Sequence, residues 1–136
     1  MSDASIKGPG RVIGIGGVFF QSPGPERLRA WYGANLGIEH GAYGAQFLWR
    51  GEDRPEVGQR TIWSVFPAES TYFAPSDAGF MINYIVDDLD ALLGKLGERG
   101  EKIDPKREDT DYGRFAWIVD PDGNKIELWE PSADKG

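Results

Sequence analysis

The sequence predicts a single α+β domain in which one order of elements, a strand, a helix and then further strands, occurs twice. The chain has 136 residues, 40% of them hydrophobic, a length typical of one domain with a sizeable core. Aligning Gly17 with Met81 also aligns the far ends of the two halves, where Trp63 falls on Glu127. Identity between the halves is low, so the repeat is inferred from the pattern of elements.

β-branched and aromatic segments bounded by turn residues predict the strands. We expect strands over residues 11–21, 45–49, 61–66, 80–86, 114–119 and 125–130. Residues 120–124, Asp-Pro-Asp-Gly-Asn, join the last two strands as a hairpin turn, because Pro presets φ and Gly or Asn accepts a positive φ. Gly123 and Glu127 do not stand at the positions that a calcium-binding loop requires for its Gly and Glu.

Two segments place apolar residues at helical spacing. The first helix is expected over residues 25–36, with Pro at its start and an apolar stripe of Leu28, Trp31, Tyr32 and Leu36. The second is expected over residues 89–99, with a stripe of leucines. Asp87 or Asp88 is well placed to cap the second helix, and Gly100 ends it.

The chain divides into one folded unit and two short ends. Residues 1–10 and 132–136 are small and polar, and we expect them to be flexible. The single domain is expected over residues 11–131, with a first module at about 11–67 and a second at about 79–131.

The composition excludes several kinds of site. There is no cysteine and one histidine, His40, so a cysteine nucleophile, a disulfide framework, a thiolate zinc site and a multi-histidine metal site are excluded. His40 itself is expected to be a solvated surface residue. The formal charge of −7 and the lack of a long basic run argue against a nucleic-acid partner. No apolar stretch predicts a membrane span or a signal peptide, which makes the cytoplasm the expected location.

Several segments of the second half resemble the vicinal oxygen chelate superfamily, which includes glyoxalases, bleomycin-resistance proteins and extradiol dioxygenases. The resemblance is carried by Asn-Tyr-Ile-Val-Asp-Asp-Leu-Asp at 83–90, by Tyr-Gly-Arg-Phe at 112–115 and by Asp-Pro-Asp-Gly-Asn-Lys-Ile-Glu-Leu at 120–128. The first half is similar in a weaker form, from Phe19 to Ile38.

The resemblance implies two βαβββ modules that form a curled mixed sheet around a ligand cleft, commonly in a homodimer. It also implies four metal-binding positions in the members that use a metal, which fall here on Gly17, Trp63, Met81 and Glu127. Of these four, only the Glu127 carboxylate is a suitable ligand for a hard divalent ion. We therefore expect no metal and no other cofactor.

Strand alternation predicts which other side chains face the cleft. The expected binding residues are Phe19, Gln21, Trp63, Met81, Asn83, Phe115, Trp117 and Trp129. This set is mostly aromatic with a few polar groups, as is usual for a small-molecule site. The same count places Thr61 and Val65 on the cleft face beside Trp63.

Two functional classes remain open. In one, the protein is a metal-free binding protein for a small apolar or aromatic molecule, and an acidic cleft would favour a cationic ligand. In the other, it is a metal-independent isomerase or lyase in which Glu127 is the general base and Tyr112 orients the substrate. A weaker alternative is a metal-dependent lyase or dioxygenase of the same superfamily. Whether the protein is an enzyme therefore stays open at this point.

Overall fold

The computed structural model describes residues 8–41 and 44–132, so the expected flexible ends, residues 1–10 and 132–136, lie mostly outside the described part. The strands are β1 (Val12–Ser22), β2 (Ala45–Arg50), β3 (Gly58–Pro67), β4 (Phe80–Val86), β5 (Lys102–Thr110), β6 (Gly113–Val119) and β7 (Lys125–Pro131). The helices are α1 (Pro25–Leu36) and α2 (Leu89–Glu98). No helix in the described residues is long and apolar enough to cross a membrane.

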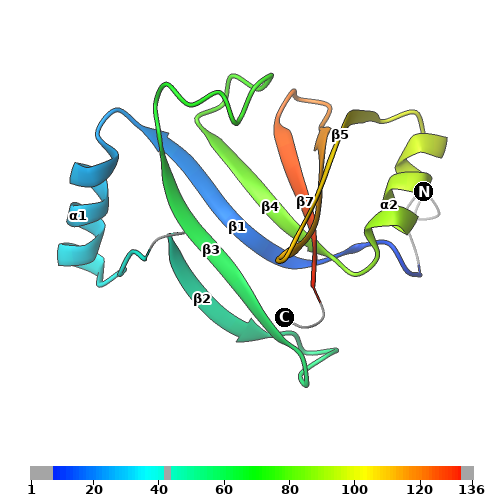
Figure 1. Ribbon diagram of the computed structural model, residues 1–136, viewed down its shortest axis with the longest axis horizontal. Helices are drawn as coiled ribbons and strands as arrows, with labels where there is room; N and C mark the ends of the chain where they lie inside the picture. Colours follow the sequence, from blue (N-terminus) through cyan, green and yellow to red (C-terminus); the bar gives the residue numbers. More distant parts are fainter. Residues whose placement is uncertain (1–7, 42–43, 133–136) are drawn as a thin grey trace.

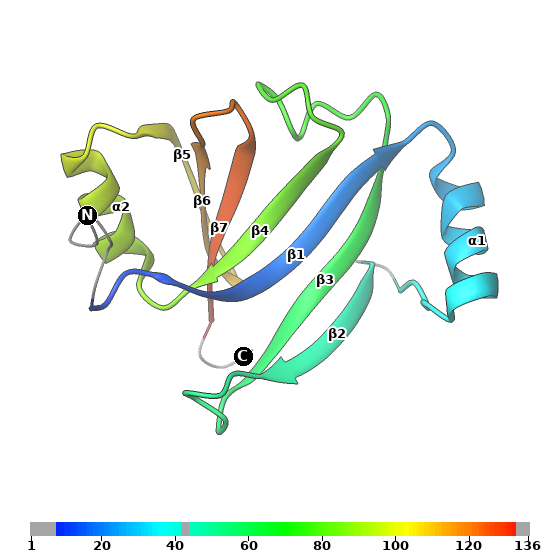
Figure 2. The same cartoon turned by 180° about the vertical axis from the view of Figure 1, so that it is seen from behind.

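One mixed sheet of seven strands forms the body of the molecule, in the order β2-β3-β1-β4-β7-β6-β5. The sheet curls, with α1 beyond one end and α2 at the other (Figure 1), and the view from behind shows the same arrangement (Figure 2). The predicted α+β class is confirmed. After α1, the described part of module one has two strands and an isolated bridge between Gly41 and Gly44, where the resemblance implied three strands.

The centre of the sheet confirms the alignment of the first strand of each module. β1 and β4 run antiparallel, and Gly17 pairs with Asn83 while Phe19 pairs with Met81. Gly17 and Met81 are equivalent positions in the two modules, and so are Phe19 and Asn83. Each of the two pairs is therefore the symmetry equivalent of the other. The two modules are therefore related by an approximate twofold axis at this point of the sheet.

The core of module two lies between α2 and one face of the sheet. Its buried members are Val86, Leu89, Leu92, Ala116 and Leu128. A second buried cluster, made by Phe73, Met81 and Trp117, lies on the opposite face. This division follows the alternation of β4, β6 and β7, and it leaves the face opposite α2 for the aromatic side chains that the sequence placed in the cleft.

The two helices differ in how they pack. In α1 no residue is buried, and Trp31 and Leu36 are 53% and 60% exposed, so the predicted apolar stripe is largely uncovered in the chain. Tyr32 is the member that reaches the sheet, where its ring lies 4.8 Å from Trp63 and 6.2 Å from Phe20. Module one therefore has no helix-covered core like that of module two.

β5 is a strand that the sequence pattern did not predict. It is an edge strand rich in charged residues, with Pro105 in its middle, and most of its residues are exposed. Edge strands often carry charges and proline, which prevent pairing with other chains. These residues lack the apolar alternation by which strands are recognised, and so the segment was not predicted.

Asp88 is the residue that caps α2, and its side chain accepts a hydrogen bond from the Ala91 N–H at 3.1 Å. We expect Asp88→Ala to lower the free energy of unfolding by about 1 kcal/mol, because the first turn loses a partner for a backbone donor. Asp88→Asn keeps an acceptor and should cost only a fraction of this. Urea denaturation followed by circular dichroism measures both, and equal losses would contradict the role of the capping bond.

Candidate functional site

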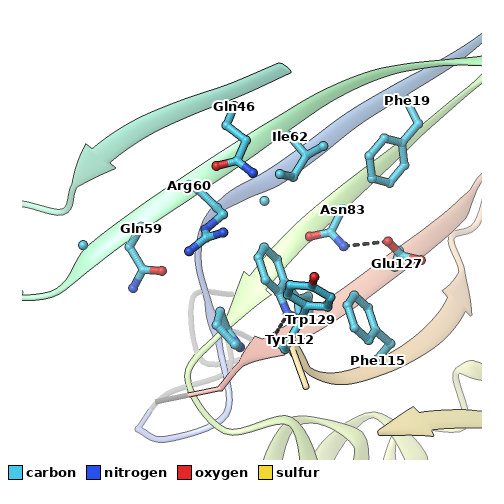
Figure 3. A pocket seen from close by; sticks show the side chains of 13 residues that line it. Phe19, Gln46, Gln59, Arg60, Ile62, Asn83, Tyr112, Phe115, Glu127 and Trp129 are labelled. Atoms are coloured by element: carbon cyan, nitrogen blue, oxygen red, sulfur yellow. Dashed lines mark hydrogen bonds between the residues drawn. The ribbon is translucent and has the colours of Figure 1, made fainter. Parts of the chain in front are cut away.

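A pocket with a volume of about 210 Å³ opens on the sheet face opposite α2, between the strands of module one and those of module two (Figure 3). It is lined by Gly16, Phe19, Gln46, Gly58, Gln59, Arg60, Ile62, Asn83, Tyr112, Phe115, Glu127, Trp129 and Pro131. Most of this lining is apolar, and the polar groups stand at separate places. Concave, mostly apolar sites with a few polar groups are typical of small-molecule binding.

Two stacked aromatic rings form one wall of the pocket. The rings of Phe115 and Trp129 are parallel within 3°, and their centroids lie 5.8 Å apart. The indole N–H of Trp129 donates to the backbone oxygen of Tyr112 at 2.8 Å, which fixes the orientation of its ring. Phe19 and Ile62 complete the apolar surface. The pocket therefore presents preoriented flat surfaces to a ligand.

Glu127 lies in the wall of the pocket as the centre of a buried hydrogen-bond network. It is 3% exposed. Its Oε1 accepts from the Asn83 Nδ2 at 2.7 Å, and its Oε2 accepts from the Trp117 Nε1 at 2.9 Å and from the Tyr72 hydroxyl. Three donors on two oxygens satisfy the buried carboxylate, which is the condition under which a charged group is tolerated in an interior.

Tyr72 reaches this network from the loop between β3 and β4. Its ring stacks on Phe66, with an interplanar angle of 16° and a centroid distance of 5.6 Å. Burial, together with the neighbouring Glu127 carboxylate, raises the pKa of the Tyr72 hydroxyl, so Tyr72 stays protonated as a donor. The next residue, Phe73, is 1% exposed and packs on Met81 and Trp117. The loop thus closes the part of the sheet face where the metal-binding positions would lie.

One atom of the Asn83 side-chain amide is hydrogen-bonded within the chain, and the other has no hydrogen-bond partner among the described residues. The flipped amide would set Oδ1 against the Glu127 carboxylate oxygen, so Nδ2 faces the carboxylate and Oδ1 faces away. Asn83 is 2% exposed, and no group in the described part of the chain hydrogen-bonds to its Oδ1. A Cβ on Gly16 would lie 2.3 Å from this oxygen, so only glycine fits beside it.

A polar group of side chains comes from β2 and β3, on the side of the pocket across from Asn83. Arg60 and Gln59 project from β3 and Gln46 from β2 toward the pocket (Figure 3). All three carry N–H donors, and Arg60 is the only positively charged residue among the described residues of the lining. The pocket therefore has a buried acceptor on one wall and a cluster of donors on another.

The structure places nine of the ten predicted site residues in three groups. Six of them line the pocket: Phe19, Asn83, Tyr112, Phe115, Glu127 and Trp129. Met81 and Trp117 are buried in the cluster below it, where Trp117 also donates to Glu127. The Gln21 Nε2 donates to the Ser70 backbone oxygen at 2.9 Å, so this side chain holds the loop after β3 and does not line the pocket.

Trp63 lies on the other face of the sheet. Its ring is 5.3 Å from Phe20, 4.8 Å from Tyr32 and 5.2 Å from His40. The placement of Trp63 in the cleft, with Thr61 and Val65 beside it, is therefore corrected. In β3 it is Arg60 and Ile62 that line the pocket.

A one-residue difference between the modules causes this error. In module one Gly17 of the first strand pairs with Ile62 of the last strand, and in module two Ile82 pairs with Ile126. The two paired residues are therefore one residue closer along the chain in module two than in module one. The alignment that holds for the first strands therefore slips by one at β3, and Ser64 takes the position equivalent to Glu127. A slip of one residue moves every side chain of a strand to the other face.

The slip explains why the sequence did not predict Arg60 and Ile62. Gln59 lies before the predicted strand 61–66, Gln46 lies in β2, for which no face was predicted, and Tyr72 lies in a loop without a motif. His40 also differs from expectation. It is partly buried against Trp63, and its Nε2 has no hydrogen-bond partner in the described part of the chain. Burial lowers the pKa of the His40 imidazole, and the positive charge of the nearby Arg29 lowers it further. The signal that would have found the β3 residues is the alternation of β3 counted from its own pairing with β1.

Three of the four metal-binding positions, Gly17, Met81 and Glu127, do not fit a divalent ion, and in the observed register the fourth falls on Ser64. Both oxygens of Glu127 accept hydrogen bonds from donors, and Met81 is fully buried beside Phe73. A Cβ on Gly17 would lie 2.6 Å from the Phe19 ring, so an aromatic side chain occupies the space next to that position. Within the described residues, no three His, Cys, Asp or Glu side chains gather.

Known proteins resemble this chain in structure but share little of its sequence. Neither a protein-family model nor a curated protein matches the chain. Methylmalonyl-CoA epimerase from Mycobacterium tuberculosis is similar in structure, with 17% identity and a TM-score of 0.64 over 98% of this chain and 97% of the other.

Two further structures extend the likeness. A glyoxalase/bleomycin resistance protein/dioxygenase superfamily member from Vibrio splendidus 12B01 is 15% identical, with a TM-score of 0.55 over 88% of this chain and 97% of the other. The Mn(II)-bound glyoxalase from Novosphingobium aromaticivorans is 23% identical, with a TM-score of 0.58 over 88% of this chain and 39% of the other. The chain therefore has a glyoxalase-like fold, as its motifs predicted.

Proposed function

We propose that this protein binds a small apolar or aromatic organic molecule in the pocket, without a metal. The observation that carries the proposal is the lining itself: parallel Phe115 and Trp129 rings face a space that ends at the buried Asn83 amide and Glu127 carboxylate. A flat molecule would replace water against the aromatic wall and gain the free energy of burying apolar surface.

The surroundings of Glu127 favour binding over proton transfer. A general base needs a lone pair directed at the proton that it removes. In this chain the donors Asn83, Trp117 and Tyr72 already occupy the carboxylate oxygens. Three of the roughly four lone-pair sites of the carboxylate are therefore taken, and at most one on Oε1 is left for a substrate proton. The same carboxylate serves better as a fixed part of the wall than as a base.

Metal independence is part of the proposal, because Glu127 is the one hard-metal ligand among the four positions and its oxygens are engaged by donors. Elemental analysis of protein purified without chelators is the test, and one tightly held divalent ion per chain would contradict it. The homodimer and the cytoplasmic location stay predictions.

Binding can be tested with 1-anilinonaphthalene-8-sulfonate as the probe. We expect one saturable site per chain by calorimetry. Gln46→Trp should weaken binding at least tenfold, because an indole at this exposed lining position would fill the mouth of the pocket. The matched control is Phe47→Trp, since Phe47 is the adjacent exposed residue and is outside the lining. Binding that both variants leave unchanged would place the probe elsewhere and contradict the proposal.

The isomerase alternative has a direct test, because the similar structures include methylmalonyl-CoA epimerases. We expect no exchange of the substrate α-proton when methylmalonyl-CoA is incubated with this protein in D₂O and followed by proton NMR. Exchange that is present in the unaltered protein and lost in Glu127→Gln would contradict the binding proposal and support the base role.

A further inference from the structure

We propose that the ligand is a flat aromatic molecule with a hydrogen-bond donor at one end, such as a phenolic hydroxyl, and a carboxylate or similar anion at the other. This inference rests on the proposed function, because it assigns the ligand class of the same pocket. It is argued from the two polar ends of the pocket, Asn83 at one and Arg60 with its neighbours at the other.

The first end demands a donor from the ligand. The Asn83 Oδ1 is an acceptor on a side chain that is 98% buried, and no described group hydrogen-bonds to it. Its orientation is fixed from behind, because Nδ2 is held by Glu127 at 2.7 Å. Gly16 packs beside this oxygen, where any larger residue would collide with it. A hydroxyl or N–H of the ligand would satisfy this acceptor, whereas an acceptor group placed there would be repelled.

The other end favours an anion. The guanidinium group of Arg60 has five N–H donors in a planar fork, a geometry that suits a carboxylate. Gln46 and Gln59 stand beside it and can each add an amide N–H (Figure 3). An acidic cleft would favour a cationic ligand, but Arg60 stands at this end of the pocket, and no acidic side chain of the described residues lines it there.

The distance between the two ends is bridged by apolar surface, which requires a ring in the middle of the ligand. Phe115 and Trp129 stack in parallel on one side, and Ile62 and Phe19 contribute from module one. Figure 3 shows the Asn83 and Arg60 side chains on different strands, and both residues line the pocket. A molecule that carried both polar groups on one ring system could reach both ends at once.

A matched series of compounds tests the class on the unaltered protein. The reference is 6-hydroxy-2-naphthoate, 2-naphthoate lacks the hydroxyl, and 2-naphthol lacks the carboxylate. We expect the reference to bind about tenfold more tightly than either deletion, since each lost group forfeits roughly one net hydrogen bond. The same comparison of 4-hydroxybenzoate with benzoate and phenol covers a shorter separation of the groups.

One variant pair assigns the anion end. Arg60→Gln should remove the gain from the carboxylate, so that 6-hydroxy-2-naphthoate and 2-naphthol bind alike, while affinity for 2-naphthol is unchanged. Arg50→Gln is the control, because Arg50 lies on the adjacent strand β2 outside the lining. The control should leave all affinities as they were.

Different outcomes would contradict the ligand class and the proposed small-molecule binding. Equal binding of all compounds in both series, or tighter binding of 2-naphthylmethylamine than of 2-naphthoate, would overturn the ligand class and leave a small-molecule pocket standing. Failure of every aromatic compound and of 1-anilinonaphthalene-8-sulfonate to bind would instead overturn the proposed function.

Discussion

Replacing Glu127 with alanine should lower the free energy of unfolding by about 3 kcal/mol. The carboxylate is 3% exposed and accepts from the buried groups Asn83 Nδ2 and Trp117 Nε1, at 2.7 and 2.9 Å. Alanine leaves both donors without a partner, and each orphaned buried group costs about 1–3 kcal/mol. Tyr72 is 36% exposed, so its hydroxyl can turn toward water and adds less to the loss.

Urea denaturation followed by Trp fluorescence and by circular dichroism measures this effect. Glu108→Ala is the control, because Glu108 also lies in the sheet but is exposed, with a surface ion pair to Lys106 at 3.3 Å, and its replacement should change stability by less than about 0.5 kcal/mol. Glu127→Gln keeps the side-chain volume and one acceptor oxygen, so its loss of stability should lie between those of Glu127→Ala and Glu108→Ala. A loss below about 1 kcal/mol for Glu127→Ala would show that the donors find other partners.

The role of Glu127 as a structural centre explains why a motif could locate the residue without revealing its task. The Lys-Ile-Glu-Leu segment predicted a strand with Glu127 on the cleft face, and the structure has it there. Its donors come from β4, β6 and a loop after β3. Tyr72 lies 55 residues away in sequence, and no spacing rule links such a loop residue to the site.

Module two was predicted better than module one for a physical reason. Its helix α2 has a leucine stripe that is buried on the sheet, so apolar periodicity reports the fold directly. In module one, α1 has no buried residue, and its apolar residues carry little information about the fold. With no packed helix to set the face of β3, a count carried over from module two placed Trp63 on the wrong side.

The missed Arg60 shows how such an error reaches the function. Counted from the alignment with module two, β3 offered Thr61, Trp63 and Val65 to the cleft, an apolar set consistent with any aromatic ligand. Counted from its pairing with β1, the strand offers Arg60 and Ile62, and the same cleft acquires a positive charge. Register decides which face a side chain occupies, so a shift of one residue adds a charged side chain to a cleft wall that was expected to have none.

Gly113→Ala is the second substitution with a large expected effect, a loss of at least about 3 kcal/mol in the free energy of unfolding. Gly113 begins β6 with φ at +126°, a value that side-chain-bearing residues rarely adopt. An added Cβ would lie 2.1 Å from the Glu130 backbone oxygen and 2.8 Å from the Pro131 Cα, and neither backbone atom can move aside as a flexible side chain can.

The strain should also reach the pocket, because the preceding residue, Tyr112, accepts from the Trp129 indole at 2.8 Å. We therefore expect Gly113→Ala to weaken binding of 1-anilinonaphthalene-8-sulfonate under conditions where the variant is still folded. Gly123→Ala is the matched control: φ is +88° but the space around the Cβ is open, so only backbone strain of about 1 kcal/mol remains, far from the pocket lining. If both variants lose the same stability and keep the same affinity, the β7 backbone yields to the Cβ, and the contact of Gly113 with β7 does not hold the Trp129 wall in place.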